Sequence, residues 1–171
     1  MADTTTNSLL IPTLLAVFGF FGKSAYDIYI DKRKRNRELL ESKLQKFYWP
    51  IFIRLEKNED IYIDLYQGKK EAEDTLAHKI ANTIEKEILM PNHKEILEVI
   101  TKYRYLANPD KSIDGYLKAY IRHVSVYYGL IDAKVDKFPE AVSNAPYPPG
   151  IYEYFKEKTL NLQADLDNKN F

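Results

Sequence analysis

Apolar residues form one continuous run near the start of this chain. Residues 8–22 (SLLIPTLLAVFGFFG) carry no charge. These 15 residues would make about 22 Å of helix, which is shorter than a hydrocarbon core of roughly 30 Å. Extending the helix to Ile30 gives 23 residues and about 34 Å, enough to cross a bilayer with some tilt. Lys23 and Asp27 would then lie inside or at the edge of the membrane, on one helix face.

A cluster of five positive charges follows this run. Its members are Lys32, Arg33, Lys34, Arg35 and Arg37. Basic residues next to a membrane span mark its cytoplasmic side, and each near an anionic surface contributes on the order of 1 kcal/mol. The pattern predicts an N-terminal tail and single transmembrane helix over residues 1–31 in the inner (cytoplasmic) membrane. Residues 32–171 would then form a cytosolic domain.

Three other interpretations of the run compete with a membrane span. A secretory signal peptide starts with positive charges, but MADTTTNS has no Lys or Arg, and no clear cleavage site follows. A buried core helix is the stronger rival, because apolar stretches below 18 residues are often of that kind. An interfacial helix needs a charged face, which residues 9–21 lack. The basic cluster favours the membrane span.

Beyond residue 37 the apolar residues recur at helical spacing, which predicts an all-α fold. Helices are expected over residues 37–46, 47–68, 69–90, 91–108, 112–137 and 151–166, with Pro50 starting or kinking one of them and Gly68 and Pro91 ending two others. The clearest amphipathic helix is residues 69–90, in which apolar residues recur every four positions. Its predicted buried stripe is Ala72, Leu76, Ile80, Ile84 and Ile88. The four prolines of residues 138–150 predict a loop.

Charge is balanced overall but unevenly placed. The 171 residues have a net charge of zero, although residues 32–37 carry five positive charges. The chain outside this cluster offers no general basic field, so membrane contact is favoured over nucleic acid and no DNA partner is expected. The absence of cysteine excludes disulfides, thiolate metal sites and a Cys nucleophile.

Candidate catalytic groups are few. His78, His93 and His123 are the three histidines, and none has a metal-ligand spacing or belongs to a known catalytic motif. Arg122 and His123 are adjacent, so they point about 100° apart on a helix and do not converge on one substrate. The sequence therefore predicts no catalytic residue, no metal and no cofactor.

The layout resembles the small accessory membrane proteins encoded beside RNA-guided, RNA-cleaving CRISPR effectors of the type VI-B class. The resemblance rests on the N-terminal apolar helix, the basic stop, and a helical domain containing FYWPIFIRLEKNE and PYPPGIYEYF. It implies a homo-oligomeric, ring-shaped pore that enhances CRISPR-dependent antiphage defence when the effector detects phage transcripts. It also implies a helical domain related to HEPN ribonucleases.

The chain departs from the catalytic HEPN pattern. No histidine lies four to six residues beyond Arg54, Arg104 or Arg122, so the Arg-x4-6-His signature is absent. A degenerate HEPN-type ribonuclease is therefore the third hypothesis for function. The first is a membrane pore, and the second is a membrane-tethered helical interaction module without pore activity.

A pore and a tether make different demands on the membrane helix, because only a pore needs many copies and a polar stripe. A stripe that becomes more polar toward the cytosolic end is present on one side of the expected helix. The pore-lining candidates are Phe20, Lys23, Ser24, Asp27 and Asp31.

Overall fold

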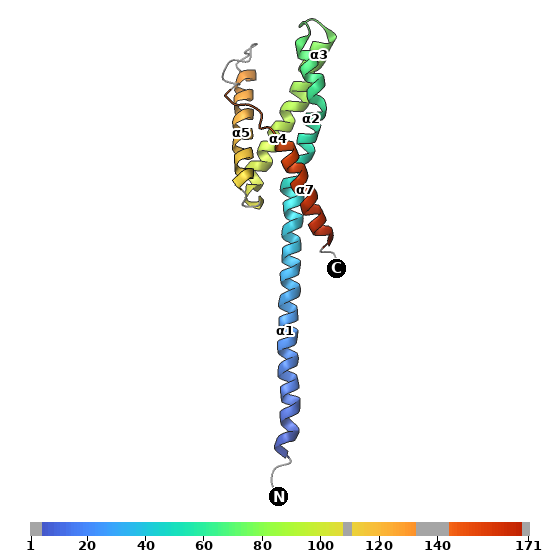
Figure 1. Ribbon diagram of the computed structural model, residues 1–171, viewed down its shortest axis with the longest axis vertical. Helices are drawn as coiled ribbons and strands as arrows, with labels where there is room; N and C mark the ends of the chain where they lie inside the picture. Colours follow the sequence, from blue (N-terminus) through green and yellow to red (C-terminus); the bar gives the residue numbers. More distant parts are fainter. Residues whose placement is uncertain (1–4, 108–110, 133–143, 169–171) are drawn as a thin grey trace. The chain divides into compact units, whose positions relative to one another are not determined.

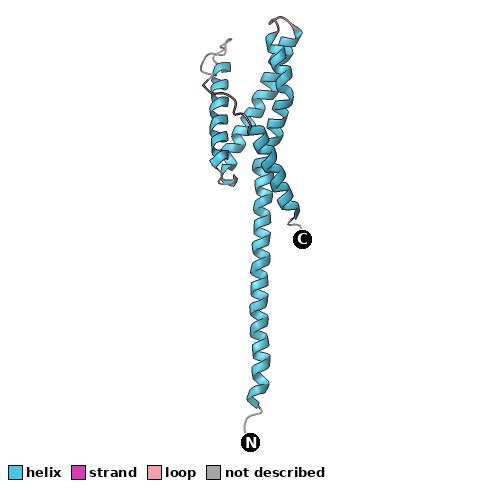
Figure 2. Cartoon of the chain, in the orientation of Figure 1, coloured by secondary structure: helices cyan, strands magenta, loops and turns pink. Residues whose placement is uncertain are grey.

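The computed structural model describes residues 5–107, 111–132 and 144–168, with side chains for all of these except residues 5–17, 63, 111 and 132. Throughout these ranges the regular secondary structure is helical, which confirms the all-α fold class (Figures 1 and 2). The long helices are α1 (Thr5–Lys43), α2 (Trp49–Lys70), α3 (Leu76–Ile84), α4 (Met90–Tyr103), α5 (Lys111–Asp132) and α7 (Ile151–Asn168). Two π-helical turns (Leu44–Tyr48 and Glu85–Leu89) and a 3-10 turn (Arg104–Leu106) separate some of them.

The chain divides into two compact units. The first covers Met1–Leu40 and the second covers Glu41–Phe171. Helix α1 accounts for the regular structure of the first unit, and only its last three residues belong to the second. Over the described residues, none of the helices combines the length and apolar character needed to cross a membrane.

Both π-helical turns lie directly before a proline. The Trp49 N–H donates to the Leu44 carbonyl and the Met90 N–H donates to the Glu85 carbonyl, five residues back in each case. Pro50 and Pro91 follow in the first turns of α2 and α4. A proline has no N–H, and its ring clashes with the carbonyl four residues earlier. Because a π turn widens the helix locally, it accommodates the ring while the helical course continues.

The structure corrects the predicted boundaries around residues 69–90. Helix α2 continues through Gly68 to Lys70, and α3 begins only at Leu76, after a turn. The side chain of Thr75 caps α3 by accepting a hydrogen bond from the His78 N–H at 3.2 Å. Pro91 does not end a helix, because the preceding π turn absorbs its steric cost. The expected kink or start at Pro50 is observed as the beginning of α2.

An aromatic cluster forms the centre of the second unit. Phe47 and Tyr48 from the first π turn and Phe155 from α7 are completely buried. The Phe47 and Tyr48 ring centroids are 5.1 Å apart, and each lies about 6 Å from Phe155. Aromatic pairs in this geometry contribute about 0.5–1.5 kcal/mol beyond the area they bury. The cluster therefore joins the start of the domain to its last helix.

Helices α2 and α3 form an antiparallel hairpin that is unusually close at one point (Figure 1). A Cβ atom added at Gly68 would lie 2.7 Å from the Ala81 Cβ and 2.8 Å from the Ala77 carbonyl oxygen. Both distances are shorter than van der Waals contact. The hairpin is thus closed by small residues, and Gly68 is required for its packing rather than for a turn.

This packing also corrects the predicted core of α3. Ala81 is buried, whereas Leu76 and Ile80 are 74% and 50% exposed. The apolar stripe expected on one buried face therefore divides. Leu76 and Ile80 face solvent, whereas Ile84 packs against the buried cluster that includes Ala81. Ala81, which lies outside the predicted stripe, is the residue whose side chain approaches Gly68.

Replacing Gly68 by Ala should destabilise the protein by about 1–3 kcal/mol, since the added methyl overpacks the hairpin. A lower midpoint of urea or thermal unfolding would show this. Gly115→Ala is the matched control, because no atom lies within 4 Å of its added Cβ. It should be neutral or stabilising by about 0.5–1 kcal/mol. Equal midpoints for the two variants would contradict the close packing.

Candidate functional site

The five pore-lining candidates share one side of α1. At about 100° of rotation per residue, Phe20, Lys23, Ser24, Asp27 and Asp31 fall within an arc of about 100°. Ser24 is half-buried, and the other four are exposed. The backbone geometry expected from the sequence is therefore present, with an aromatic ring at one end of the stripe and polar side chains after it.

Apolar side chains cover most of the circumference of the same stretch of α1. Their exposed fractions lie between 60% and 70% for Phe18, Phe20, Phe21, Tyr26, Ile28 and Tyr29. At about 100° per residue they leave one arc of about 120°, between Tyr26 and Phe20, and Lys23 and Asp27 lie in that arc. Exposed apolar surface of this extent marks an interaction site. The surroundings that would bury it must be apolar on several sides.

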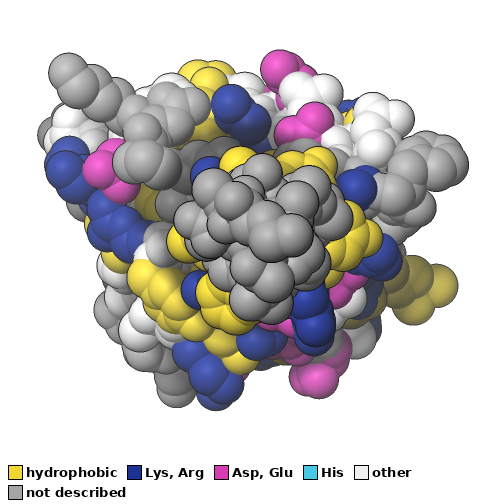
Figure 3. Space-filling view, turned by 90° about the horizontal axis from the view of Figure 1, so that it is seen from below, with side chains coloured by type: hydrophobic (Ala, Val, Ile, Leu, Met, Phe, Trp, Pro, Cys, Tyr) yellow, Lys and Arg dark blue, Asp and Glu magenta, His cyan; other side chains and the backbone are white. Residues whose placement is uncertain are grey.

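The basic cluster forms a collar rather than a stripe. Lys32, Arg33, Lys34 and Arg35 are consecutive in α1 and point in four directions. A collar suits a helix that passes through a plane of anionic headgroups. A nucleic-acid surface would need the charges gathered on one side. On the face drawn in Figure 3, Lys and Arg side chains are also interrupted by apolar ones, and no continuous basic field is visible.

A histidine–tyrosine cluster between α4 and α5 was not predicted from the sequence. His93 Nδ1 lies 2.6 Å from the Tyr120 hydroxyl, and both residues are buried. The His93 and His123 ring centroids are 6.5 Å apart. His123 stacks on Tyr127, with 6.2 Å between the centroids, and its Nδ1 donates to the Ala145 carbonyl at 2.8 Å. The three α5 residues follow one helix face, but their pairing with His93 gave no signal in the sequence.

Burial sets the protonation of this cluster. Together with a smaller contribution from the neighbouring His123, it lowers the pKa of His93 to about 4. Burial also raises the pKa of Tyr127, and Glu85, which accepts the Tyr127 hydrogen bond, adds to the rise. Near neutral pH, His93 is therefore uncharged and Tyr127 keeps its proton. Acid–base catalysis is most efficient when the pKa lies near the working pH, and the pKa values of both groups lie far from neutrality.

Tyr127 also belongs to a polar contact that joins α2, α3, the second π turn and α5. Its hydroxyl donates to Glu85 in the second π turn. Lys69 Nζ, at the end of α2, lies 2.5 Å from Glu85 Oε2 and 2.5 Å from Asn82 Oδ1. A buried carboxylate with two partners is satisfied electrostatically. The contact fixes α2, α3 and α5 relative to one another, and each of its four polar side chains has a hydrogen-bond partner within it.

A second polar pair lies inside the domain. Asn92 Nδ2 donates to Asn58 Oδ1 at 2.8 Å, and both side chains are buried. This bond links α4 to α2 beside His93. It stabilises the relative position of the two helices, because a buried amide without such a partner costs about 1–3 kcal/mol.

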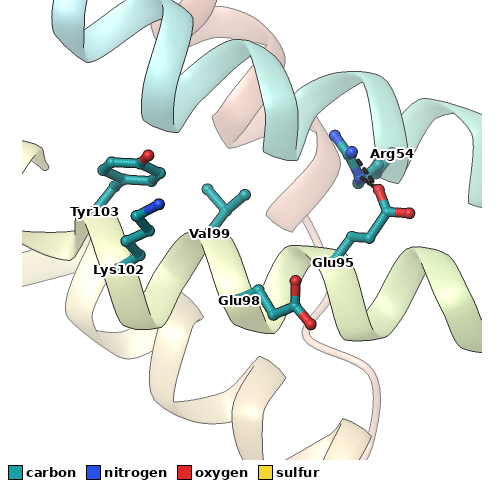
Figure 4. A pocket seen from close by; sticks show the side chains of 6 residues that line it. All are labelled: Arg54, Glu95, Glu98, Val99, Lys102 and Tyr103. Carbon is teal, nitrogen blue, oxygen red and sulfur yellow. Dashed lines mark hydrogen bonds and ion pairs between the residues drawn. The ribbon is translucent and has the colours of Figure 1, made fainter.

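An open pocket of about 420 Å³ lies between α2 and α4 (Figure 4). Its lining is Arg54, Glu95, Glu98, Val99, Lys102 and Tyr103. Arg54 Nε donates to Glu95 Oε2 at 2.5 Å, so the two helices are bridged at the pocket's edge. The lining holds two acids and two bases, with no histidine or serine. The lining therefore holds no Ser–His or Cys–His pair, and Lys102, Tyr103 and the two glutamates are its proton-exchanging groups.

The other candidate catalytic groups do not converge. Arg122 is exposed, whereas the ring of its neighbour His123 faces the tyrosine cluster. His78 lies on α3, where its Nδ1 is 3.1 Å from the Glu71 carbonyl oxygen. Within the described ranges, no three His, Asp or Glu side chains are placed to hold a metal ion together.

The buried His93 predicts a pH dependence of stability. Because its pKa is about 4 in the folded state and about 6.5 when unfolded, the unfolded chain binds more protons between these values. The free energy of unfolding should therefore fall as the pH drops from 6.5 toward 4, by up to about 3 kcal/mol from this group. His93→Gln should reduce this slope in urea titrations at several pH values, and His78→Gln should leave it unchanged. An unaltered slope in His93→Gln would refute the assignment.

Comparison with known proteins adds no assignment: no protein-family model, no curated protein and no solved structure matches this chain.

Proposed function

We propose that this protein is a homo-oligomeric, single-pass membrane protein whose N-terminal helices surround a pore. The observation that supports this most directly is the surface of α1. Apolar side chains cover most of the circumference between Phe18 and Ile30, the remaining arc holds Lys23 and Asp27, and a basic collar follows at once. A lipid surrounding would bury the apolar side chains, and anionic headgroups on the cytoplasmic side would meet the collar.

The polar stripe favours an assembly over a single helix. A charge at the bilayer centre costs at least about 2.5 kcal/mol on insertion scales. Lys23, Asp27 and Asp31 would avoid this cost if identical helices turned them toward a water-filled lumen. Phe20 would then form an apolar constriction that gates by dewetting, with a charged vestibule beside it. The lipid membrane and further copies of this chain are the partners that this arrangement needs.

The resemblance to type VI-B accessory proteins gives the pore a biological role. In this proposal the pore disturbs the inner membrane and enhances CRISPR-dependent antiphage defence after the RNA-guided effector detects phage transcripts. The helical domain of residues 32–171 lies in the cytoplasm, on the side where the effector acts.

The second candidate is a membrane tether without pore activity. Its support is the position of Lys23 and Asp27, four residues apart on α1. A lysine can extend its apolar stem and place its charge at the headgroups, where Asp27 would already lie. A single copy would then satisfy both charges, and the helical domain would recruit a cytosolic partner.

Single Lys23→Leu and Asp27→Leu variants separate the two functions. In a pore, both should keep the oligomeric mass of the detergent-solubilised particle but change the membrane depolarisation that the parent causes. Lys94→Leu, an exposed lysine of α4, is the control and should match the parent in both measurements. Parent-like depolarisation in both α1 variants, or no depolarisation by the parent, would exclude the pore.

Exchanging all five residues of the basic collar for Gln should remove the orientation signal. Reporter fusions at the C-terminus should then become mixed in orientation or lose membrane association. The matched control changes five exposed lysines of the helical domain, Lys57, Lys79, Lys94, Lys118 and Lys156. A uniform cytosolic signal from the collar variant would show that another feature sets the topology.

A further inference from the structure

The α2–α3 hairpin has two flanks of different chemistry. Ile61, Leu65 and Gly68 of α2 face α3, and Ala81 faces them from the other side. The Lys69 bonds to Asn82 and Glu85 mark one flank of this contact. At about 100° per residue, Tyr62 and Tyr66 lie on the side of α2 nearest that flank.

We call this side the tyrosine flank, defined by Tyr62, Tyr66 and Lys70. The two tyrosines are 55% and 51% exposed, and their rings stack with centroids 6.1 Å apart. Lys70 Nζ lies 3.9 Å from the centre of the Tyr66 ring. The flank is thus a preformed, exposed aromatic surface with Lys70 at its end, and by the same helical rotation the exposed Glu59 lies on it as well.

The opposite side is the aliphatic flank, defined by Leu76, Ile80, Asp60, Asp64 and Glu87. By the same helical rotation these residues lie on the other side of the α2–α3 contact. All five are exposed, and Leu76 is 74% exposed. The exposed Lys57 also lies on this flank. Because the flank carries three acidic side chains and this one basic side chain, its net charge is negative.

The exposure of Leu76 and Ile80 has a structural cause within the hairpin. The close contact of Gly68 with Ala77 and Ala81 lies on another side of α3 from Leu76 and Ile80, which are left in solvent. Burying a Leu or Ile side chain in an apolar contact is favourable. The single chain leaves most of the surface of these two side chains in water, and a partner surface would bury it.

We propose that the tyrosine flank of one copy packs against the aliphatic flank of the next. Tyr62 and Tyr66 would cover Leu76 and Ile80, and Lys70 would meet the acidic side chains around Asp64. Because the two surfaces differ, the contact is head to tail and generates a ring when the rotation closes. The inference rests on the proposed homo-oligomer and assigns its cytosolic interface.

Other occupants fit these charges less well. Two aliphatic flanks packed together would bring two acidic sets into contact, and like charges oppose such pairing. An anionic lipid surface would be repelled by the same acids. The positive charge that complements the acidic aliphatic flank is Lys70, which the tyrosine flank of a second copy would supply.

Cross-linking tests the pairing directly, because the chain has no cysteine. The full-length protein would carry Tyr66→Cys and Ile80→Cys together, or Tyr62→Cys and Leu76→Cys together, and be treated with a short bismaleimide in detergent. A head-to-tail contact predicts a ladder from dimer upward for a double variant and none for its single variants. Dimers from Ile80→Cys alone, or no ladder from either double variant in an intact oligomer, would overturn the proposal.

A mass measurement gives an independent test. Leu76→Ser with Ile80→Ser should reduce the particle to the mass of one chain in detergent, with unchanged helical circular dichroism. The control, Tyr105→Ser with Leu160→Ser, replaces two residues that are also exposed, at 76% and 51%. It should keep the parent mass. An unchanged mass for the flank variant would contradict the interface.

Charge reversal distinguishes this contact from a general loss of apolar surface. Lys70→Asp should shift the particle toward single chains, and adding Asp64→Lys should restore the oligomer. Absence of both effects in an oligomeric parent would overturn the interface and leave the pore proposal standing. A parent that is itself a single chain would overturn both.

Discussion

The burial of Phe47 and Tyr48 against Phe155 is the contact on which the helical domain depends. It joins residues more than a hundred positions apart, and all three side chains are fully buried. The two rings from the first π turn are adjacent in sequence and both point inward. An ordinary α-helix would separate them by about 100°. The wider turn before Pro50 accommodates the proline, and both of its aromatic side chains are part of the core.

The second π turn repeats this solution with polar chemistry. It precedes Pro91 and presents Glu85 to Lys69 and Tyr127. The His93 and Tyr120 pair follows in the next turns, so α5 is held by buried hydrogen bonds as well as by apolar packing. In a low-dielectric interior, a buried polar group that loses its hydrogen-bond partner destabilises the fold. The native pairing of these side chains is therefore favoured over other helix arrangements. This explains how a domain rich in tyrosine keeps a defined packing.

Two surfaces carry the proposed function, because one chain does not bury them. The first is the apolar surface of α1 with its basic collar, for which a membrane is proposed. The second is the pair of flanks on the α2–α3 hairpin, for which further copies of the chain are proposed. An assembly of identical chains in a membrane would bury both.

The sequence alone determined the helical class, the last helix and much of the core. Ile51 and Leu55 of α2, Ile96 and Ile100 of α4, and Leu117 of α5 lie at positions of the helical apolar repeat and are all buried, because helical periodicity depends only on local rotation. It also placed the five candidates from Phe20 to Asp31 on one side of α1. Tertiary structure decided which apolar face of α3 is buried, whether Pro91 ends a helix, and which histidines meet. These depend on the close approach at Gly68, on the π turns, and on contacts between residues far apart in the chain, none of which a local pattern encodes.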